Sequence, residues 1–340
     1  MKVLVTGGTG YIGSHTCVEL LNSGHDVVIL DNLSNSKIEV LKGIREITGK
    51  NLKFYEMDYL DKDSINRVFE ENKIDAVINF AGYKAVGESI HKPLEYYINN
   101  INGVLNILDA SRKHKVKKFI FSSTATVYSF SNTMPLTEES KLGDTTNPYS
   151  TSKLFIERIL NDLYESDKSW DIAILRYFNP VGAHESGLIG EDPNGIPNNL
   201  MPYIDKVSVG ELEKLNIYGN DYNTHDGTGV RDYIHVVDLA KGHVLALDKL
   251  FKEEKGLFIY NLGTGTGYSV LDLVRTYEKT NDVTIPFKIA PRRLGDVDLY
   301  YTSTTKAEKE LGFKPNKTIE DMCHDSHEFV KMKIKTLQTK

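Results

Sequence analysis

The feature that most constrains this chain is a glycine-rich turn between two apolar segments near its N-terminus. The first segment, 3–6, has the short, β-branched composition of a buried parallel strand. A helical pattern then runs to Gly24, and a second apolar strand, 27–30, ends at Asp31. Between the first strand and the helix stand four glycines, Gly7, Gly8, Gly10 and Gly13. This order of elements predicts a βαβ unit.

In such a unit the glycine turn is expected to bind a dinucleotide. Glycines allow a tight turn and let backbone N–H groups approach a pyrophosphate at the helix N-terminus. Asp31 stands about 20 residues further on, where a carboxylate accepts hydrogen bonds from a ribose diol. A plain glycine turn is the alternative, and the complete order of elements argues against it. No arginine adjoins Asp31 to bind a 2′-phosphate, so we expect NAD rather than NADP, and Lys37, the nearest cation, leaves NADP as the alternative.

Short apolar strands continue to alternate with helical segments. We expect a long helix from about His91 to His114, and strands at 52–55, 76–80, 119–121 and 172–175. This alternation predicts an α/β fold with a doubly wound parallel (Rossmann) sheet. Thr124 follows the strand at 119–121, and the carboxyl ends of strands are where such sheets bind ligands. A turn hydroxyl is the alternative role for Thr124.

The composition changes after residue 180. The segment from about 181 to 229 is rich in Gly, Pro, Asn and Asp and has little periodicity, which indicates a smaller mixed α/β domain that caps the sheet and binds substrate. The segment 230–237 is interpreted as a strand that returns to the first domain, and 257–262 as another strand. We therefore predict a NAD-binding domain over 1–180, joined by returning segments near 230–255, and a smaller, discontinuous domain over 181–340, to which the resemblance described below assigns the binding of a UDP-sugar.

The pair Tyr149 and Lys153 is the candidate catalytic motif. A phenol with a pKa near ~10 is a poor base at neutral pH, but a cation about 4–6 Å away lowers such a pKa by roughly 1–3 units. Residues four apart share one helix face. Lys153, helped by an oxidised nicotinamide ring, is therefore expected to make Tyr149 a general base. The spacing also arises by chance, as a ring packed under a lysine stem, so this interpretation depends on the rest of the chain.

Composition restricts the partners. The chain has 340 residues, of which 40% are hydrophobic and 26% charged, and its net charge is −6. That sign argues against nucleic acid or an anionic membrane as a partner. Cys17 and Cys323 are far apart, so we expect no disulfide, no metal site and a cytoplasmic location. The N-terminal apolar run is too short for a signal peptide, and no stretch reaches the ~20 apolar residues of a membrane helix.

Several strings resemble a known family. Residues 6–15 (TGGTGYIGSH), the Tyr149–Lys153 pair and residues 176–183 (RYFNPVGA) together resemble the extended short-chain dehydrogenase/reductases. Longer strings are similar to the UDP-glucose 4-epimerase group of that family: 80–89 (FAGYKAVGES), 195–203 (GIPNNLMPY), 226–235 (DGTGVRDYIH) and 290–293 (APRR). The resemblance covers essentially the whole chain.

The resemblance implies an isomerase of galactose metabolism that interconverts UDP-glucose and UDP-galactose. In that mechanism Tyr149 takes the proton of the sugar 4-hydroxyl while hydride passes from C4 to a tightly held NAD. The 4-keto sugar then rotates about its link to UDP and takes the hydride back on its other face. Thr124 is expected to hydrogen-bond between Tyr149 and the 4-oxygen, and Lys153 to hold the nicotinamide ribose and tune Tyr149.

The resemblance also implies the binding residues. The expected cofactor contacts are Gly7, Gly10, Tyr11, Ile12, Gly13, Asp31, Asn32, Leu33, Ser34, Asn35, Ser36, Asp58, Tyr59, Phe80, Ala81, Gly82, Tyr83, Lys84, Asn99, Ser122, Thr124, Tyr149, Lys153, Tyr177 and Phe178. The expected substrate contacts are Thr124, Tyr149, Asn179, Asn199, Leu200, Asn216, Ile217, Tyr218, Arg231, Arg293, Asp296 and Tyr300. Guanidinium groups suit phosphate oxygens, so Arg231 and Arg293 are expected on the diphosphate.

Tyr300 holds what resembles the family's gate position beside the sugar. Its ring should leave little room for a 2-acetamido group, so we expect a preference for UDP-glucose and UDP-galactose over their N-acetyl forms. Thr124 stands where some members carry serine, and its methyl group restricts the rotamer. Ser129 and Ser150 replace glycines that are often seen, and either would be strained if its φ had to be positive.

Three other functions fit parts of the sequence. A 4,6-dehydratase on this scaffold needs an acid/base pair directly after Thr124, where this chain has Ala125 and Thr126. A net dehydrogenase that exchanges its cofactor is not excluded by the sequence. A non-catalytic NAD-sensing regulator has no need for Tyr149, Lys153 and Thr124 together. The family usually forms homodimers by pairing two helices per subunit, so we expect a homodimer through about 91–114 and 148–166.

Overall fold

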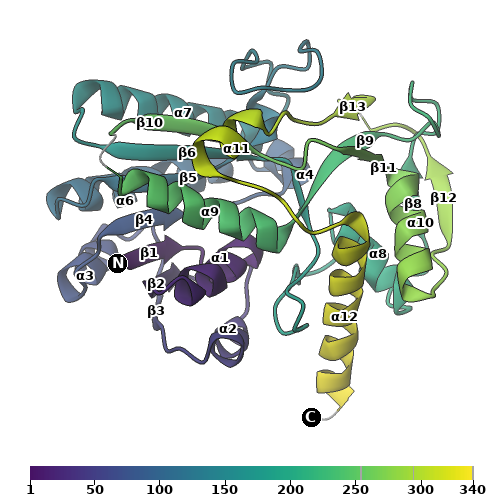
Figure 1. Cartoon of the computed structure of the whole chain (residues 1–340), viewed down its shortest axis with the longest axis horizontal. Coiled ribbons are helices and arrows are strands. Elements are labelled where there is room, and N and C mark those ends of the chain that lie inside the picture. The colour runs from purple at the N-terminus through teal and green to yellow at the C-terminus, as the bar shows by residue number, and fades with distance from the viewer. Residues whose placement is uncertain (253–254, 294, 339–340) are drawn as a thin grey trace.

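The larger part of the structure is a seven-stranded sheet in the order β10-β6-β5-β4-β1-β2-β3 (Figure 1). The computed structural model describes residues 1–252, 255–293 and 295–338. All neighbouring strands of this sheet are parallel: β1 (Lys2–Thr6), β2 (Asp26–Asp31), β3 (Lys53–Glu56), β4 (Ala76–Asn79), β5 (Lys118–Thr124), β6 (Asp171–Tyr177) and β10 (Leu257–Leu262). The strand order reverses between β1 and β4, which is where such sheets bind ligands. The predicted doubly wound parallel sheet is confirmed.

Helices cover both faces of this sheet. On one face lie α1 (Tyr11–Asn22), α2 (Val40–Thr48) and α9 (Val236–Leu250), and on the other lie α3 (Lys62–Glu71), α6 (Gly103–Lys113) and α7 (Pro148–Ser166). Strand β1 shows why both faces must be covered. Val3 and Val5 pack into the core under α1, whereas Leu4 between them packs into the opposite core. Strands that are apolar on both sides are typical of parallel sheets.

The smaller part begins directly after β6, where β7 (Asn179–Val181) pairs with β9 (Val230–His235). Strand β9 also pairs with β11 (Gly267–Ser269) and β13 (Leu299–Tyr300), and β8 (Leu215–Tyr218) pairs with β12 (Phe287–Ala290). The helices of this part are α8 (Leu200–Ser208), α10 (Val270–Asn281) and α12 (Ile319–Gln338), which share an apolar core with these strands. Because β7 follows β6 immediately, this part adjoins the carboxyl edge of the parallel sheet.

The segment after residue 230 differs from the prediction. The sequence placed a strand at 230–237 in the first domain, but β9 belongs to the smaller four-stranded sheet. The chain returns only with α9, which packs against α1, and with β10 beside β6. Residues 253–254 of the predicted returning segment lie outside the described residues. The division into domains 1–180 and 181–340 remains a prediction.

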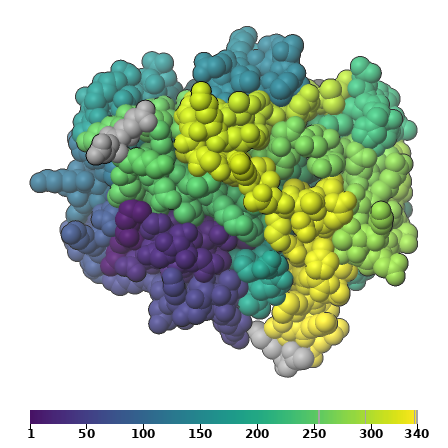
Figure 2. Space-filling model, in the orientation of Figure 1, coloured from purple at the N-terminus to yellow at the C-terminus, as the bar shows by residue number. Residues whose placement is uncertain are grey.

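The C-terminal segments connect the two parts. Helix α11 (Thr305–Leu311) contributes Ala307 and Leu311 to the core of the large sheet, and α12 joins the core of the smaller part. Figure 2 shows these segments, coloured yellow, running across one face between the N-terminal elements and the smaller sheets. Each described helix is too short or too polar to cross a membrane.

The helix predicted from about 91 to 114 is interrupted. It consists of α5 (Pro93–Tyr97), a π-helical turn η1 (Ile98–Asn102) and α6, after a short helix α4 (Val86–His91). The wide turn presents two buried side chains. Asn99 donates to the Tyr59 hydroxyl at 3.0 Å, and Asn100 accepts from the backbone N–H of Tyr83 at 2.7 Å. Single π turns occur frequently at functional sites.

Gly103, which begins α6, lets this turn lie against Tyr59. A Cβ at Gly103 would lie 2.2 Å from the Tyr59 ring. Alanine normally stabilises an exposed helix, but here the added methyl group meets a side chain that is itself buried and hydrogen-bonded to the Asn99 carbonyl.

We expect Gly103→Ala to lower the free energy of unfolding by about 1–3 kcal/mol, as overpacking does. Gly87→Ala in α4 is the matched control, since a Cβ there meets no atom within 4 Å, and we expect no loss of stability. Urea titration of both variants measures the difference. Equal stability of the two would contradict the packing argument.

Candidate active site

Tyr149 and Lys153 lie one turn apart in α7, as predicted. Pro148 opens the helix, and the Asn147 side chain caps it by accepting from the backbone N–H of Ser150 at 2.9 Å. Tyr149 therefore stands in the first turn, and α7 packs against β5 and β6. The ammonium of Lys153 is buried, donates to the Ser122 carbonyl at 2.7 Å and lies 4.8 Å from the centre of the Phe121 ring.

Thr124 ends β5 and begins a short 3₁₀ turn, η2 (Ala125–Val127). Its hydroxyl accepts from the backbone N–H of Thr126 at 3.2 Å and lowers the pKa of Tyr149. Thr126 was not predicted, yet its hydroxyl lies 3.1 Å from that of Thr124 and accepts from Ser150 at 2.8 Å. A row of hydroxyls thus runs from Thr124 through Thr126 to Ser150, and Thr124 also caps the turn η2.

Neither serine that replaces a glycine is strained. Ser129 and Ser150 are not among the described residues with a positive φ other than glycine, which are Leu33, Lys115, Asp144 and Asp282. Ser150 instead uses its hydroxyl on Thr126, and Ser129 donates to Asp144 at 2.5 Å. Both substitutions therefore add hydrogen bonds near the approach to Tyr149.

The electrostatics of the pair differ from the expectation. Burial raises the pKa of Tyr149, and the hydrogen bond with Thr124 opposes this only in part. Burial also lowers the pKa of Lys153 to about 8, against the attraction of the Glu157 carboxylate. The protein groups by themselves therefore shift the phenol away from the predicted direction, because desolvation penalises its anion. A phenolate here needs more positive charge than Lys153 alone supplies, which fits an oxidised nicotinamide ring.

The glycine turn fits a pyrophosphate. Helix α1 begins at Tyr11 with no side-chain cap and no acidic residue in its first turn. Gly7 has φ +70°, and a Cβ there would lie 2.7 Å from the backbone nitrogen of Ala81. A Cβ at Gly13 would lie 2.2 Å from the Gly7 carbonyl oxygen. Only glycine permits this cradle, which leaves the helix N-terminus open to an anion.

The predicted cofactor residues lie at the ends of the first parallel strands. Asp31 accepts from the backbone N–H groups of Thr9, at 3.1 Å, and Leu33, at 2.9 Å, and so shapes the turn beside the cradle. Asp58 accepts from the Asn32 amide at 3.0 Å. The structure therefore brings the β1, β2 and β3 ends together.

Two polar residues near the predicted cofactor residues around Lys153, Asn100 and His243, were not predicted from the sequence. Asn100 is buried, binds the backbone of Tyr83 and donates to Ser152 at 3.0 Å. His243 of α9 is hydrogen-bonded to the Tyr177 hydroxyl and lies 4.8 Å from Phe80, centroid to centroid. Two adjacent asparagines within the predicted helix were the sequence feature that could have identified Asn100. No sequence feature singled out His243.

The predicted substrate residues gather in the smaller part. Asp296 accepts from Arg293 at 2.9 Å and from Arg231 at 3.5 Å, and the Arg293 guanidinium lies 5.1 Å from the centre of the Tyr218 ring. Asn216, on the same strand as Tyr218, has a buried side-chain oxygen without a hydrogen-bond partner among the described residues. The guanidinium groups of Arg231 and Arg293, which meet at Asp296, suit an anionic nucleotide.

Tyr300 connects the smaller part to the turn η2 that follows Thr124. It is 7% exposed, its hydroxyl donates to the Ala125 carbonyl at 2.7 Å, and its ring centre lies 6.0 Å from that of Phe178. Asn179 begins β7, directly after Phe178, while Asn199 and Leu200 form the start of α8. The structure thus places Tyr300 next to the residue that follows Thr124.

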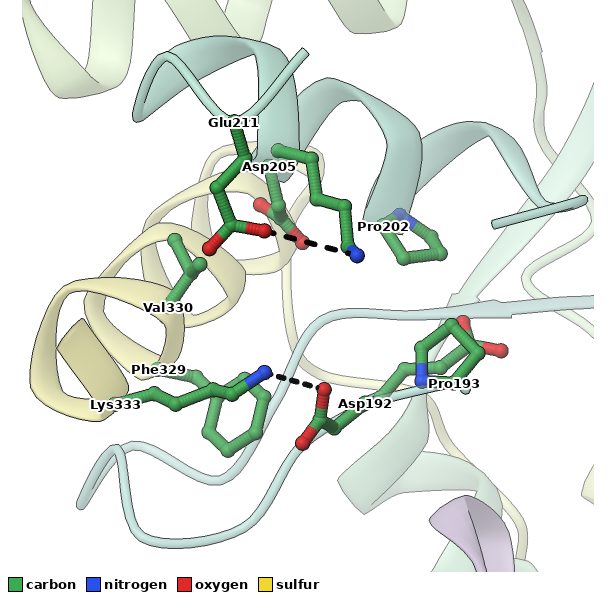
Figure 3. Close-up of a pocket in the computed structure, with 10 residues that line it drawn as sticks. Asp192, Pro193, Pro202, Asp205, Glu211, Phe329, Val330 and Lys333 are labelled. Carbon is green, nitrogen blue, oxygen red and sulfur yellow. Dashed lines mark hydrogen bonds and ion pairs between the residues drawn. The ribbon is translucent and has the colours of Figure 1, made fainter. Parts of the chain in front are cut away.

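An acidic segment that was not predicted links the two parts. Glu191 accepts from Lys84 at 2.8 Å and from Asn199 at 2.9 Å. Its neighbour Asp192 binds Lys37, in the loop after β2, and Lys333 of α12. Figure 3 shows Asp192 and Lys333 facing each other at the edge of a pocket near α8 and α12. This pocket is lined by none of the predicted site residues.

Three exposed or half-buried groups outside this site, His225, Asp226 and Asp272, bring ligand atoms within 4.8 Å of one another. Asp226 accepts from Thr228 and Ser269, and Asp272 caps α10. Their oxygens are therefore used by the fold, and they add nothing to the site around Tyr149.

The chain is similar to known proteins over almost its whole length. The chain matches a family model described as GDP-mannose 4,6 dehydratase over residues 4–326. It is 58% identical over 326 residues to a UDP-glucose 4-epimerase of Bacillus subtilis, and the match covers 96% of each chain.

Two solved structures are also similar. The UDP-glucose 4-epimerase of Bifidobacterium longum, in complex with NAD+ and UDP, has a TM-score of 0.94 and 56% identity, with 98% of both chains covered. That of Stenotrophomonas maltophila, with bound NAD and formylated UDP-arabinopyranose, has a TM-score of 0.96 and 46% identity, with 99% of both chains covered.

Proposed function

The chain belongs to the family that the GDP-mannose 4,6 dehydratase model describes and, within it, to the UDP-glucose 4-epimerases, and we propose how its residues interconvert UDP-glucose and UDP-galactose. The observation that carries the proposal is the position of Tyr149, Lys153 and Thr124, together at the carboxyl edge of the parallel sheet. NAD is the cofactor, and when bound it accepts a hydride from the sugar C4 and returns it. The remaining steps belong to side chains of the protein.

We propose that the cradle at Gly7, Gly10 and Gly13 holds the pyrophosphate through the backbone of Tyr11 and Ile12. Asp31 then binds a ribose, Asp58 lies by the adenine, and the segment from Phe80 to Lys84 borders the rest. Lys153 has three N–H donors, of which one is used on Ser122. The other two can bind the ribose and the Tyr149 oxygen, which orients both.

Tyr149 is proposed to take the proton of the sugar 4-hydroxyl and to give it back. Thr124, which lowers the pKa of Tyr149, is proposed as the second group on that oxygen. Because burial raises the pKa of Tyr149, deprotonation requires both positive charges, the ammonium of Lys153 and the oxidised nicotinamide ring. The base is therefore active only while an oxidised cofactor is in place, which couples proton transfer to hydride transfer.

The UDP end must stay fixed while the keto sugar turns. Arg231 and Arg293 are proposed to bind the diphosphate, since they already converge on Asp296. Asp296 is proposed to accept from the uridine ribose, and Asn216 to use its free oxygen on the uracil side. With every strong contact on UDP, the hexose is left free to present either face.

The alternatives are disfavoured by particular residues. A dehydratase needs a carboxylate after Thr124. This chain has Ala125 and Thr126 there, and the Ala125 carbonyl and the Thr126 hydroxyl accept hydrogen bonds from Tyr300 and Ser150. A net dehydrogenase must release its cofactor, whereas Glu191 and Asp192 tie the cofactor loops at Lys84 and Lys37 to the smaller part. Both cysteines are buried and free, which suits the cytoplasmic location that we propose.

A homodimer is supported by an exposed apolar surface on two helical segments. Ile90 and Leu94 are 58% and 70% exposed, Ile98 is 51% exposed, and Phe155 of α7 is 50% exposed and stacks on Tyr97. Contiguous apolar patches of this kind mark interaction sites. We propose that a second copy of the chain covers them.

The purified protein is expected to convert UDP-galactose to UDP-glucose with no NAD added, since NAD should stay bound. Tyr149→Phe should lower kcat by about 10²–10⁴, as loss of a general base does. Tyr164→Phe, later on the same helix, is the control. Product formation is followed by chromatography. Activity that appears only with added NAD would favour a net dehydrogenase, and an unchanged Tyr149→Phe would remove the proposed base.

Tyr300 is expected to select against N-acetylated sugars. Tyr300→Cys should raise the kcat/KM for UDP-N-acetylglucosamine relative to UDP-glucose by about tenfold or more, because a ring is removed from the sugar side. Tyr300→Phe keeps the ring and should keep the wild-type preference. Comparable turnover of both sugars by the wild type would contradict this role.

The dimer is tested at Leu94. Leu94→Glu should place a charge in the proposed interface and shift the protein to monomers, measured by sedimentation velocity. Phe287→Glu, at an exposed site on β12, is the control and should leave the assembly unchanged. A wild-type chain that sediments as a monomer would contradict the proposal.

A further inference from the structure

A third residue continues the row of Tyr149 and Lys153 along α7. Glu157 lies four residues after Lys153, so the three side chains share one helix face. Its side chain is 5% exposed. The proposed reaction uses Tyr149 and Lys153 and gives Glu157 no role, although a buried carboxylate one turn from a catalytic ammonium affects that ammonium directly.

The carboxylate of Glu157 is fully engaged. Its Oε1 accepts from the Ser123 hydroxyl at 2.5 Å and from Arg176 Nε at 3.1 Å, and its Oε2 accepts from a terminal nitrogen of Arg176 at 2.7 Å. Ser123 is the neighbour of Ser122, whose carbonyl holds Lys153. Glu157 is therefore bonded to the same strand end that fixes the ammonium.

Arg176 is held just as firmly. It is 1% exposed, and its other terminal nitrogen donates to the Tyr128 hydroxyl at 2.9 Å. Tyr128 in turn donates to the side chain of Asn261 on β10 at 2.6 Å. A buried ion pair is weak grounds for stability, because desolvation offsets most of its attraction. Its position beneath Lys153 calls for another explanation.

We propose that Glu157 is a positioning residue for Lys153, keeping the ammonium charged and directed at Ser122, and that Arg176 limits the strength of this effect. The inference rests on the proposed function, since Lys153 matters only if Tyr149 is the base. Burial lowers the pKa of Lys153 to about 8, and the carboxylate of Glu157 raises it. Without that charge, more of Lys153 would be neutral near neutral pH and Tyr149 would lose its cation.

Other groups face this pair from every packed element. Strand β6 contributes Arg176 and Tyr177, and His243 of α9 acts through Tyr177. Helix α5 contributes Tyr96, whose hydroxyl binds Glu88 of α4. The hydroxyls of β5 and η2 belong to Ser122, Ser123, Thr124 and Thr126. Among the described groups, Glu157 is the charged residue that acts on the pKa of Lys153.

Opposite substitutions in the pair should move the pH profile in opposite directions. Glu157→Gln removes the negative charge and leaves the Arg176 cation, so the pKa of Lys153 falls. The alkaline limb of kcat should then shift to lower pH by about one unit or more. Arg176→Met leaves the carboxylate without its partner, so the pKa of Lys153 rises and the limb should shift to higher pH.

A structural role predicts something different. Both variants break the same buried pair and should lose stability alike, so a merely structural pair would lower activity in both without opposite shifts. The double variant Glu157→Gln/Arg176→Met contains no unpaired buried charge, and it keeps the test available if a single variant fails to fold. The alkaline limb of the double variant should shift to lower pH. Glu157 lies one turn from Lys153 and Arg176 lies beyond Glu157, so loss of the carboxylate affects Lys153 more than loss of the guanidinium does.

The holoenzyme and each variant are assayed from about pH 6 to about pH 10 for conversion of UDP-galactose. A second readout is the tyrosinate absorbance of each protein, after subtraction of its Tyr149→Phe counterpart. Glu165→Gln, at the exposed end of α7, is the control and should not shift either curve.

Opposite shifts in the two single variants, or a downward shift in the double variant, support the proposal. Shifts in the same direction, or an unmoved limb, overturn it. An active Tyr149→Phe enzyme would contradict the proposed role of Tyr149 as the base. An inactive Tyr149→Phe enzyme, together with unmoved limbs in the Glu157 and Arg176 variants, would contradict only the role of Glu157.

Discussion

The proposed mechanism depends on a phenol that must lose its proton where the protein disfavours the anion. Burial raises the pKa of Tyr149, and each unit of pKa corresponds to about 1.4 kcal/mol. Bringing it from ~10 or above to about 7 therefore needs at least roughly 4 kcal/mol from positive charge. Lys153 is proposed to supply part of this, and the Ser122 carbonyl and the Phe121 ring hold its ammonium in place. Strand β5 and helix α7 fix that geometry.

The sequence was sufficient where structure is local. The turn at Gly7 to Gly13 and the spacing of Tyr149 and Lys153 depend on backbone geometry within a few residues, and both were predicted correctly. Strand β9 was assigned to the wrong sheet because a buried apolar strand has the same pattern in either sheet, and its partners are chosen by contacts far along the chain. The π turn at 98–102 was invisible for a similar reason, since Asn99 meets Tyr59, which lies 40 residues away.

The polar framework of the site was the least predictable part. Arg231, Arg293 and Asp296 were found through their resemblance to family strings, and the structure brings them together. Glu157 was missed because a charged residue on a helix is usually exposed, and only the fold shows that its side chain is buried against Arg176 of β6. Glu191 was missed too, because its partners Lys84 and Asn199 stand 107 and 8 residues away. Long-range ion pairs leave no periodic signal.

The distribution of these contacts matches what the reaction asks of the two ligands. A cofactor that takes and returns one hydride must stay, whereas the hexose must turn over between the two transfers. Glu191, with a side chain that is 9% exposed, and Asp192 join the loops at Lys84 and Lys37 to the smaller part. Exposed ion pairs are individually weak, but these two close over the cofactor loops from neighbouring positions. On the sugar side, Tyr300 donates to the Ala125 carbonyl, and Leu136 pairs with Tyr301 and Ser303 beside it. In the proposed mechanism the strong polar contacts are made to NAD and to UDP, so the hexose is the part that can turn.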